Sequence, residues 1–400
     1  MKQFKRLTAV IISLIMIITM ASCAGKSGDK SSGSGSAASS KIVIAYIGPL
    51  TGEASAFGIP EVNTLKMLVE KQNQEGGIIG KQVELKTYDN RNDNVETTNA
   101  AKKAIQNDGV SAIIGCNASG PTLALSSVCD ELKVPNVATT ATNSKVTVAD
   151  GGKVRPFTFR VCLADPQLGD IMAKYAYEKL NIKKVAILYQ VSSDYSTGIT
   201  QNFTDSFTKA GGSITDKEAY KTGDVDFRAQ LEKIKESSPD ALFLPLEYKE
   251  LGLATKQARS LGITQQFLGP DCWMANDLFS VAGDAIKGSM FVAPIDGSDP
   301  SLNDFKTWYR SKNNNEEPDQ AGSNAYFAYD AFVFLKAAIE KANSTDPVAI
   351  RDAMEKTTDI QGLTGKITMM PDTHNPIRSA NIFRVDADKF TSIEKFTVQY

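Results

Sequence analysis

The sequence predicts an α/β protein of two lobes, each built on a parallel sheet with helices on both faces. Short β-branched runs alternate with segments of helical spacing, which is the pattern of βα units. The alternation breaks near 160–166 and then starts again in a second series of comparable length. The chain of 400 residues also exceeds the usual size of one domain, which favours two.

The first series begins with "KIVIAYIG" (41–48), an apolar run that predicts a strand buried on both sides. Apolar residues at helical spacing predict a helix over 61–74. Three further runs predict the remaining strands of this series, at 83–89, 110–115 and 134–140.

The second series predicts strands at 184–190, 213–220, 240–246 and 265–270. After that the pattern changes to a strand at 289–294, two helices within 302–342, and a closing β-segment at 363–369 and 380–396 with a turn at 386–389. Because such a tail can return to either lobe, we expect discontinuous lobes. The predicted division is 41–162 plus 292–362 for lobe 1, and 163–291 plus 363–400 for lobe 2.

Residues 1–22 predict a secretory signal peptide. Lys2, Lys5 and Arg6 form a basic head before the apolar run of residues 7–21. That run is about fifteen residues long, whereas a membrane-spanning helix needs roughly twenty. A permanent anchor helix is the alternative interpretation.

Cys23 follows the apolar run and opens a Gly/Ser-rich segment, 23–40. The small residues Ala21 and Ser22 before it resemble a bacterial lipobox, although Met20 stands where Leu is more usual. The resemblance implies cleavage before Cys23 and lipid on its sulfur, which would anchor the protein to the membrane. A flexible linker of this length has an r.m.s. span of about 23 Å.

Charge and motifs exclude several function classes. The chain has 44 Lys+Arg and 46 Asp+Glu; the predicted signal contains three of the cations and no acid, so 41 cations remain against 46 acids, a charge of −5. No nucleic-acid partner is expected from that balance. No Gly-rich nucleotide motif follows a strand, so we expect no cofactor. Cys/His clusters of the kind that hold a metal are also absent from the sequence.

Catalysis is not expected either. The only histidine, His374, lies in the turn-rich "MPDTHNP", and a Ser–His–Asp relay would have to use it. Besides Cys23, the four remaining cysteines are expected to be free or buried thiols, with pairing in an exported protein as the alternative. They are Cys116, Cys129, Cys162 and Cys272.

Polar residues collect just after the predicted strands of the first lobe, where ligands bind in doubly wound sheets. The loop 48–58 carries Phe57, Ser119 lies before a predicted helix start, and "TTATNS" (139–144) carries Thr140 and Thr142. Hydroxyls beside a helix start predict a carboxylate receptor. Ser119 as a simple helix cap is the alternative.

The strand ends of the second lobe carry different groups. They present Tyr195, either Glu247 or Tyr248, and Asp271, so a carboxylate lies among aromatic rings. A ligand that complements both lobes has a carboxylate and a neighbouring cation, and a free amino acid fits. Asp271 as a turn residue, and the aromatic residues as ordinary packing, are the alternatives.

The order of "IAYIGPLTGEASAFG", "GCNASGPTLALSS", "VPNVATTATNS", "DYSTG" and "FLGPDCW" resembles the branched-chain amino acid-binding proteins of ABC transporters, which are type I periplasmic binding proteins. The resemblance covers nearly the whole chain from residue 41. It implies two Rossmann-like lobes, joined by three crossover segments, that close around the ligand.

The resemblance also implies roles for the individual residues. Ser119 and Thr142 would bind the α-carboxylate with the backbone around Thr140, and Asp271, where leucine-binding members more often have Glu, would meet the ammonium. Phe57 stands where a larger aromatic often covers the ligand. The residues implied to line the second lobe are Tyr195 and one of Glu247 or Tyr248.

We therefore expect a monomeric, lipid-anchored protein on the extracytoplasmic face of the cell membrane, with no enzymatic activity. It would capture a free amino acid, branched-chain or otherwise apolar, and deliver it to an ABC transporter permease. A ligand of the amide or urea type, and a sensory role for the same fold, are the alternatives.

Overall fold

The computed structural model describes residues 41–397. The predicted signal peptide 1–22 and the segment 23–40 with Cys23 lie outside the described residues, as do residues 398–400. The signal and the lipid anchor therefore stay predictions. None of the helices within 41–397 combines the length and the apolar character that a bilayer crossing requires.

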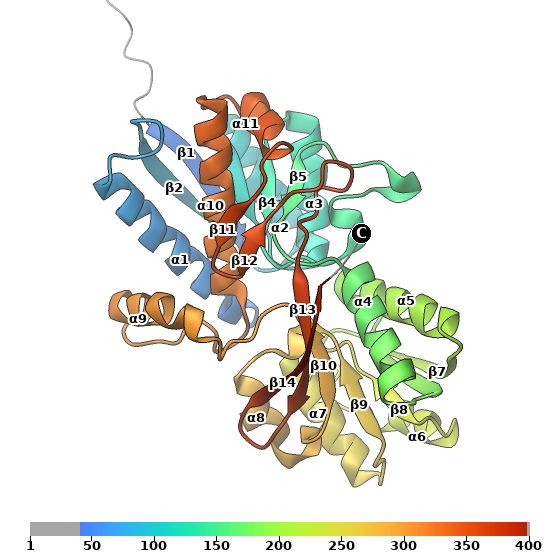
Figure 1. Ribbon diagram of the computed structural model, residues 1–400. Helices are drawn as coiled ribbons and strands as arrows, with labels where there is room; N and C mark the ends of the chain where they lie inside the picture. The colour runs from blue at the N-terminus through green and yellow to red at the C-terminus, as the bar shows by residue number, and fades with distance from the viewer. Residues whose placement is uncertain (1–40, 398–400) are drawn as a thin grey trace, which may run out of the picture. The chain divides into compact units, whose positions relative to one another are not determined.

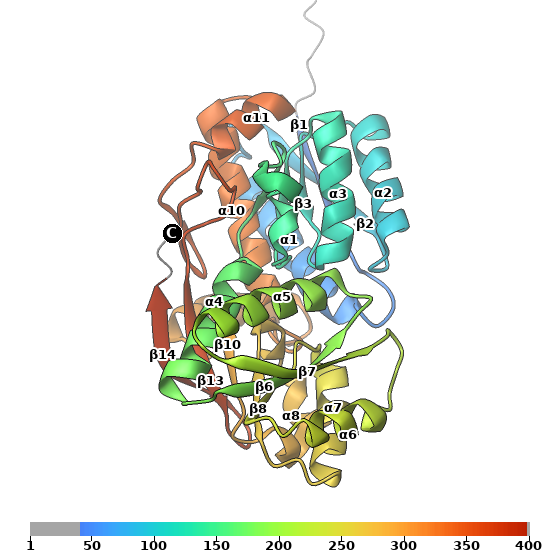
Figure 2. The same ribbon diagram turned by 90° about the vertical axis from the view of Figure 1, so that its right-hand side faces the viewer.

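The first sheet has five parallel strands in the order β2-β1-β3-β4-β5. Alternate residues of β1 contact opposite layers, as the pleat requires: Ile42 and Ile44 pack with α1 and α10, and Ala45 and Ile47 with α2 and α3. Figure 2 shows α2 and α3 side by side on one face of this sheet. The elements are β1 (Lys41–Gly48), β2 (Gln82–Asp89), β3 (Ala112–Gly115), β4 (Asn136–Ala138), β5 (Thr158–Arg160), α1 (Ser55–Gln74), α2 (Asn94–Lys102), α3 (Ser119–Leu132), α10 (Asn324–Ala342) and α11 (Pro347–Met354).

The second sheet has seven strands in the order β14-β13-β10-β9-β8-β6-β7. The strands from β10 to β7 are parallel, and β13 and β14 complete the sheet in antiparallel fashion. Helices α4 and α5 cover one face, and α6, α7 and α8 the other. The elements are β6 (Lys184–Gln190), β7 (Ser213–Tyr220), β8 (Ala241–Phe243), β9 (Gln266–Gly269), β10 (Met290–Ala293), β13 (Ser379–Val385), β14 (Phe390–Thr397), α4 (Asp165–Lys174), α5 (Asp194–Lys209), α6 (Arg228–Glu236), α7 (Tyr248–Ser260) and α8 (Asp277–Ala282).

The chain passes between the two sheets three times (Figure 1). It leaves the first sheet after β5, returns after β10 through α9 (Asn303–Lys312), and crosses again before β13. A short hairpin of β11 (Ile360–Gly362) and β12 (Gly365–Ile367) precedes the last crossing. Two α/β lobes joined by three crossovers confirm the predicted fold class.

Several local predictions were wrong or incomplete. The sequence missed β5, because its three residues include a single apolar one and form no apolar run, and it missed α11. The loop predicted over 48–58 ends early, since α1 already begins at Ser55 and includes Phe57. The core of the first lobe extends to Met369, past the predicted boundary at 362. The division of the chain into lobes stays a prediction in its boundaries.

Candidate functional site

The first-lobe part of the predicted site is built on the start of helix α3. Ser119 is the first residue of that helix, and no side chain within 41–397 caps it at Ala118. The buried Ser119 hydroxyl accepts a hydrogen bond from the backbone N–H of Asn143, at 3.3 Å. Ser119 is therefore not the helix cap. The first turn of α3 keeps N–H groups that a ligand can bind.

The segment after β4 carries the two predicted threonines, and their hydroxyls differ in use. The Thr140 hydroxyl donates to the backbone oxygen of Asn117 at 3.1 Å and accepts from the amide of Asn324 at 3.2 Å. The Thr142 hydroxyl is buried and has no hydrogen-bond partner among the described residues. An unpaired buried hydroxyl costs free energy, so Thr142 is a group that a ligand can complete.

Arg160 holds the Thr142 segment from behind. Its buried guanidinium donates to the backbone oxygens of Ala141 at 2.9 Å and Asn143 at 2.8 Å. Because these bonds tie both neighbours of Thr142, the segment is fixed before any ligand arrives. Such preorganisation lowers the entropy cost of binding.

In the second lobe, Tyr195 and Asp271 form a pair. The Tyr195 hydroxyl donates to the Asp271 carboxylate, Oδ1, at 2.8 Å. Asp271 opens the 3₁₀ turn Asp271–Trp273 directly after β9. Burial raises the pKa of Asp271 to about 6, and the Tyr195 hydrogen bond opposes that rise. No Lys or Arg within 41–397 forms an ion pair with Asp271 at 4 Å or less.

Glu247 lies next to this pair. Glu247 precedes helix α7 but does not cap it with its side chain. The residue before it, Leu246, accepts a hydrogen bond on its backbone oxygen from the thiol of Cys272, at 3.1 Å. The residue Glu247 as a whole is half-buried. Burial, followed by the charges of Glu250 and Asp271, raises its pKa to about 8. The second lobe therefore holds two neighbouring acids without a nearby cation among the described residues.

Phe57 and Tyr248 meet across the two lobes. Their ring centroids are 6.1 Å apart in an edge-to-face arrangement, a favourable geometry for aromatic pairs. Phe57 comes from α1 of the first lobe and packs against the apolar cluster of the second lobe that contains Tyr248. Tyr248 thus serves packing, whereas its neighbour Glu247 lies on the side of Asp271.

A further acid, Asp165, was missed by the sequence. It is the first residue of α4, it is fully buried, and neither carboxylate oxygen has a hydrogen-bond partner among the described residues. Thr142 lies beside it, short of hydrogen-bond geometry. Burial raises the pKa of Asp165 to about 7; Asp271 adds to the rise, and Thr142 and Arg160 oppose it. The sequence signal, "ADPQ", is that of an ordinary helix start.

The two half-sites adjoin at this point. The backbone N–H of Asp165 donates to the backbone oxygen of Thr142 at 2.8 Å. The side-chain amide of Asn143 donates to the backbone oxygen of Asp194 at 2.6 Å. A Cβ at Gly198 would lie 2.5 Å from both Asn143 and Asp165, so only glycine permits this approach of α5. The structure thus brings Ser119 and Thr142 close to the acids of the second lobe.

A second buried carboxylate, Glu61 of α1, lies behind the first-lobe half-site. It accepts hydrogen bonds from Tyr46 at 2.7 Å and Thr139 at 2.6 Å, and longer ones from Asn324 and Asn117. Burial raises its pKa to about 7, and the hydrogen bonds oppose the rise. Glu61 therefore joins α1, β4 and α10 in one network.

His374 has a structural position. It is buried and stacks on Phe159 with 3.9 Å between ring centroids. Its ring nitrogens lie 3.0 Å from the Thr158 oxygen and 3.2 Å from Glu355, and burial lowers its pKa. Among the described residues, the four cysteines are free thiols, and no cluster of His, Cys, Asp and Glu suits a metal ion.

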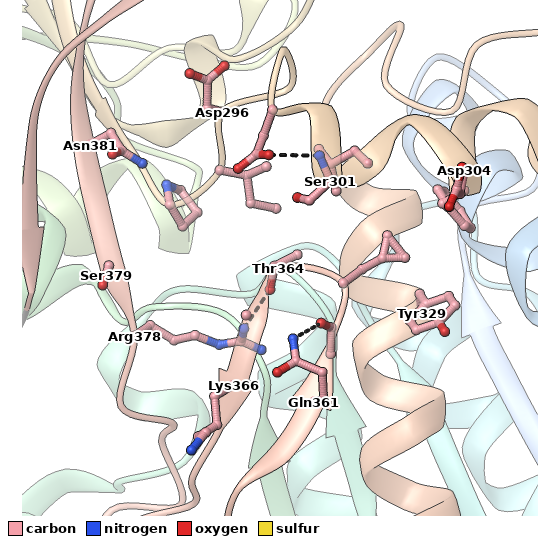
Figure 3. Close-up of a pocket in the computed structure, with 18 of the residues that line it drawn as sticks. Asp296, Ser301, Asp304, Tyr329, Gln361, Thr364, Lys366, Arg378, Ser379 and Asn381 are labelled. Atoms are coloured by element: carbon pink, nitrogen blue, oxygen red, sulfur yellow. Dashed lines mark hydrogen bonds between the residues drawn. The ribbon is translucent and has the colours of Figure 1, made fainter.

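A groove of about 1090 Å³ follows the second and third crossovers (Figure 3). Arg378 lines it and donates to Thr364 at 2.5 Å and to the buried Asp330 at 2.8 Å. None of the eight predicted ligand-binding residues lines this groove. The ion pair of Arg378 with Asp330 joins the third crossover to α10. We therefore interpret the groove as a feature of the crossover segments and not as the ligand site.

Comparison with known proteins places the fold and the chemistry in context. A family model described as periplasmic binding protein matches residues 41–390. A Leu/Ile/Val-binding protein homolog of Brucella melitensis is 29% identical over 365 residues, which are 90% of this chain and 96% of that protein.

Two solved structures are also similar. The leucine-binding protein LivK of Thermotoga maritima is 33% identical, with a TM-score of 0.80 over 89% of this chain and 99% of that one. The branched-chain amino acid transporter substrate-binding protein LivJ of Streptococcus pneumoniae, in complex with isoleucine, is 29% identical, with a TM-score of 0.79 over 90% of this chain and all of that one.

Proposed function

Because this chain belongs to the periplasmic binding protein family, we propose that it is an extracytoplasmic binding protein that captures a free α-amino acid between its lobes. It then delivers the amino acid to an ABC transporter permease. The lipid on Cys23 would keep the monomeric protein at the membrane, and no step of this function is catalytic. Similarity to leucine- and isoleucine-binding proteins supports the ligand class.

The α-carboxylate binds on the first lobe. The start of α3 offers backbone N–H groups and a partial positive charge, and Ser119 adds a hydroxyl. Thr142 adds the hydroxyl that has no partner in the described chain. Each charge-assisted hydrogen bond is worth about 1.5–3 kcal/mol, so several of them can supply much of the roughly 8 kcal/mol that micromolar binding requires.

The α-ammonium binds between Asp165 and Asp271. One observation carries this assignment: Asp165 is fully buried, faces the unpaired Thr142 hydroxyl, and has no hydrogen-bond partner among the described residues. A buried carboxylate is costly unless a cation meets it. The ammonium supplies that cation and lies next to the carboxylate that Ser119 and Thr142 bind.

Binding and closure are coupled. Phe57 closes over the ligand by packing against Tyr248 of the other lobe, and the three crossovers absorb the hinge motion. The ligand favours the closed form only through contacts that the open form lacks. The ligand provides those contacts because the first lobe binds its carboxylate and the second lobe binds its ammonium.

A thermal-shift screen of the twenty amino acids tests the proposal, followed by calorimetry on the best ligand. That ligand is compared with its deaminated acid and its decarboxylated amine. We expect only the intact zwitterion to bind at micromolar concentration. Equal binding of the acid or the amine, or binding of urea and simple amides alone, would contradict the proposed function.

A further inference from the structure

The cleft holds more acidic side chains than one α-ammonium group can pair with. Three carboxyl groups gather on its second-lobe side: Asp165, Asp271 and Glu247. Arg160 acts electrostatically on Asp165, but its guanidinium is held behind Thr142 by backbone oxygens. If the proposed function holds, the α-ammonium satisfies Asp165 and Asp271. Glu247 then remains without a partner.

Glu247 has a distinct place in the cleft. The contact of Cys272 with the Leu246 oxygen, at 3.1 Å, ties the residue beside Glu247 to the residue after Asp271. Its other neighbour, Tyr248, touches the ring of Phe57. The backbone at Glu247 thus lies between the turn that begins at Asp271 and the aromatic pair of Phe57 and Tyr248. The residue is partly exposed, and its carboxyl forms no ion pair with the described residues.

An aliphatic side chain does not satisfy Glu247 in either protonation state. As a carboxylate, Glu247 needs a donor or a cation; as a neutral acid, it needs an acceptor for its proton. Leucine, isoleucine and valine offer neither. Enclosing an unpaired polar group with such a side chain costs free energy.

We infer that this cleft selects an amino acid whose side chain ends in an ammonium group, with Glu247 as the partner of that nitrogen. The second, independent sign of a ligand here is the pair of unpartnered and fully buried groups, Thr142 and Asp165. The methylene stem of the side chain packs under Phe57, and the charged end reaches Glu247. Basic side chains commonly bury their methylene groups against apolar surface and keep the charged nitrogen in a polar environment.

Ornithine and norleucine provide a matched pair for the test, because they differ only in a terminal ammonium against a methyl group. Calorimetry on the purified, ligand-free protein should give at least tenfold tighter binding of ornithine. Norleucine or leucine binding as tightly as ornithine would overturn the inference while leaving the proposed function intact. Failure of all amino acids to bind would overturn both.

Variants of the protein test the partner itself. Glu247→Gln keeps the shape of the side chain and removes the charge, so ornithine should bind about tenfold more weakly and norleucine within twofold of its original value. Glu232→Gln removes a charge from an exposed position of α6 and should change neither affinity by more than twofold. An unchanged preference for ornithine in Glu247→Gln would exclude Glu247 as its partner. Circular dichroism verifies that each variant is folded.

Discussion

Two buried acids, Glu61 and Asp165, show how differently the same group can be used. Both are fully buried, and burial raises the pKa of each to about 7. Glu61 accepts four hydrogen bonds from four segments of the first lobe, whereas Asp165 has no hydrogen-bond partner among residues 41–397. The first arrangement stabilises the fold; the second is the one for which we propose a ligand. The predictions below test that contrast.

The largest effect is expected for Asp165→Asn. Removing one partner of a buried charge pair should weaken amino-acid binding by about 2–5 kcal/mol. The ligand-free protein should be as stable or more stable, because an unpaired carboxylate is lost. Calorimetry and urea unfolding measure the two quantities. Asp170→Asn, on the exposed side of the same helix, is the control; a loss of stability without a loss of affinity would reverse the assignment.

Glu61→Gln should show the opposite behaviour. The amide cannot accept from all four donors, so the free energy of unfolding should fall by about 1–3 kcal/mol. Affinity per folded molecule should change by less than threefold. Glu70→Gln on the same helix removes an acid from a half-exposed pair with Lys312 and should cost less than about 1 kcal/mol. Strongly weakened binding in Glu61→Gln would place Glu61 in the site.

A pH series separates the free protein from the complex. The pKa values of Glu61 and Asp165 are raised to about 7 and that of Asp271 to about 6, so the folded state holds protons that the unfolded state releases near pH 4. Stability of the free protein should therefore fall as pH rises from about 4 to 7. Amino-acid affinity should rise over pH 5 to 8, because the ammonium needs ionised acids.

Thermal unfolding with and without ligand at each pH measures both trends in the same samples. Calorimetry in two buffers of different ionisation enthalpy should show that protons are released on binding near pH 6. A ligand-induced shift that is equal at pH 5 and pH 8 would argue against carboxylates as partners of the ammonium.

The smallest effect is expected for the aromatic cover. Phe57→Ala removes the ring pair with Tyr248, which is worth about 0.5–1.5 kcal/mol beyond the buried area. Affinity should fall mainly through faster dissociation, because the closed form loses a contact between lobes. Stopped-flow fluorescence measures the rate, and Phe57→Trp should restore slow dissociation. Unchanged dissociation in Phe57→Ala would remove Phe57 from the cover.

The fold was largely predictable because it depends on local patterns. The repeated alternation of buried strands and amphipathic helices indicated two parallel sheets, and the turn at 386–389 was correctly placed. Strand β5 was missed because Phe159 is the single apolar residue among its three. Residues 363–369 were predicted in the second lobe, whereas Ile367 and Met369 pack with α10; that packing is a tertiary contact which the local pattern does not contain.

The site was predictable only where a residue type and a strand end coincide. Tyr195 and Asp271 follow strands of one sheet, and they do meet. Asp165 follows a crossover instead, and an Asp before Pro indicates a helix start rather than a binding group. Glu61 lies within a helix, and its four partners are distant in sequence. Such pairings depend on tertiary contacts that a local pattern does not contain.

The position of Asp165 on the first crossover has a consequence for the proposed delivery to a permease. The backbone N–H of Asp165 donates a hydrogen bond to the backbone oxygen of Thr142 in one lobe, while its helix belongs to the other lobe. Without a ligand, the closed protein therefore encloses an unpaired carboxyl group at its hinge. This unpaired group disfavours the closed form when no ligand is bound. A permease that binds only the closed form would therefore seldom bind the ligand-free protein.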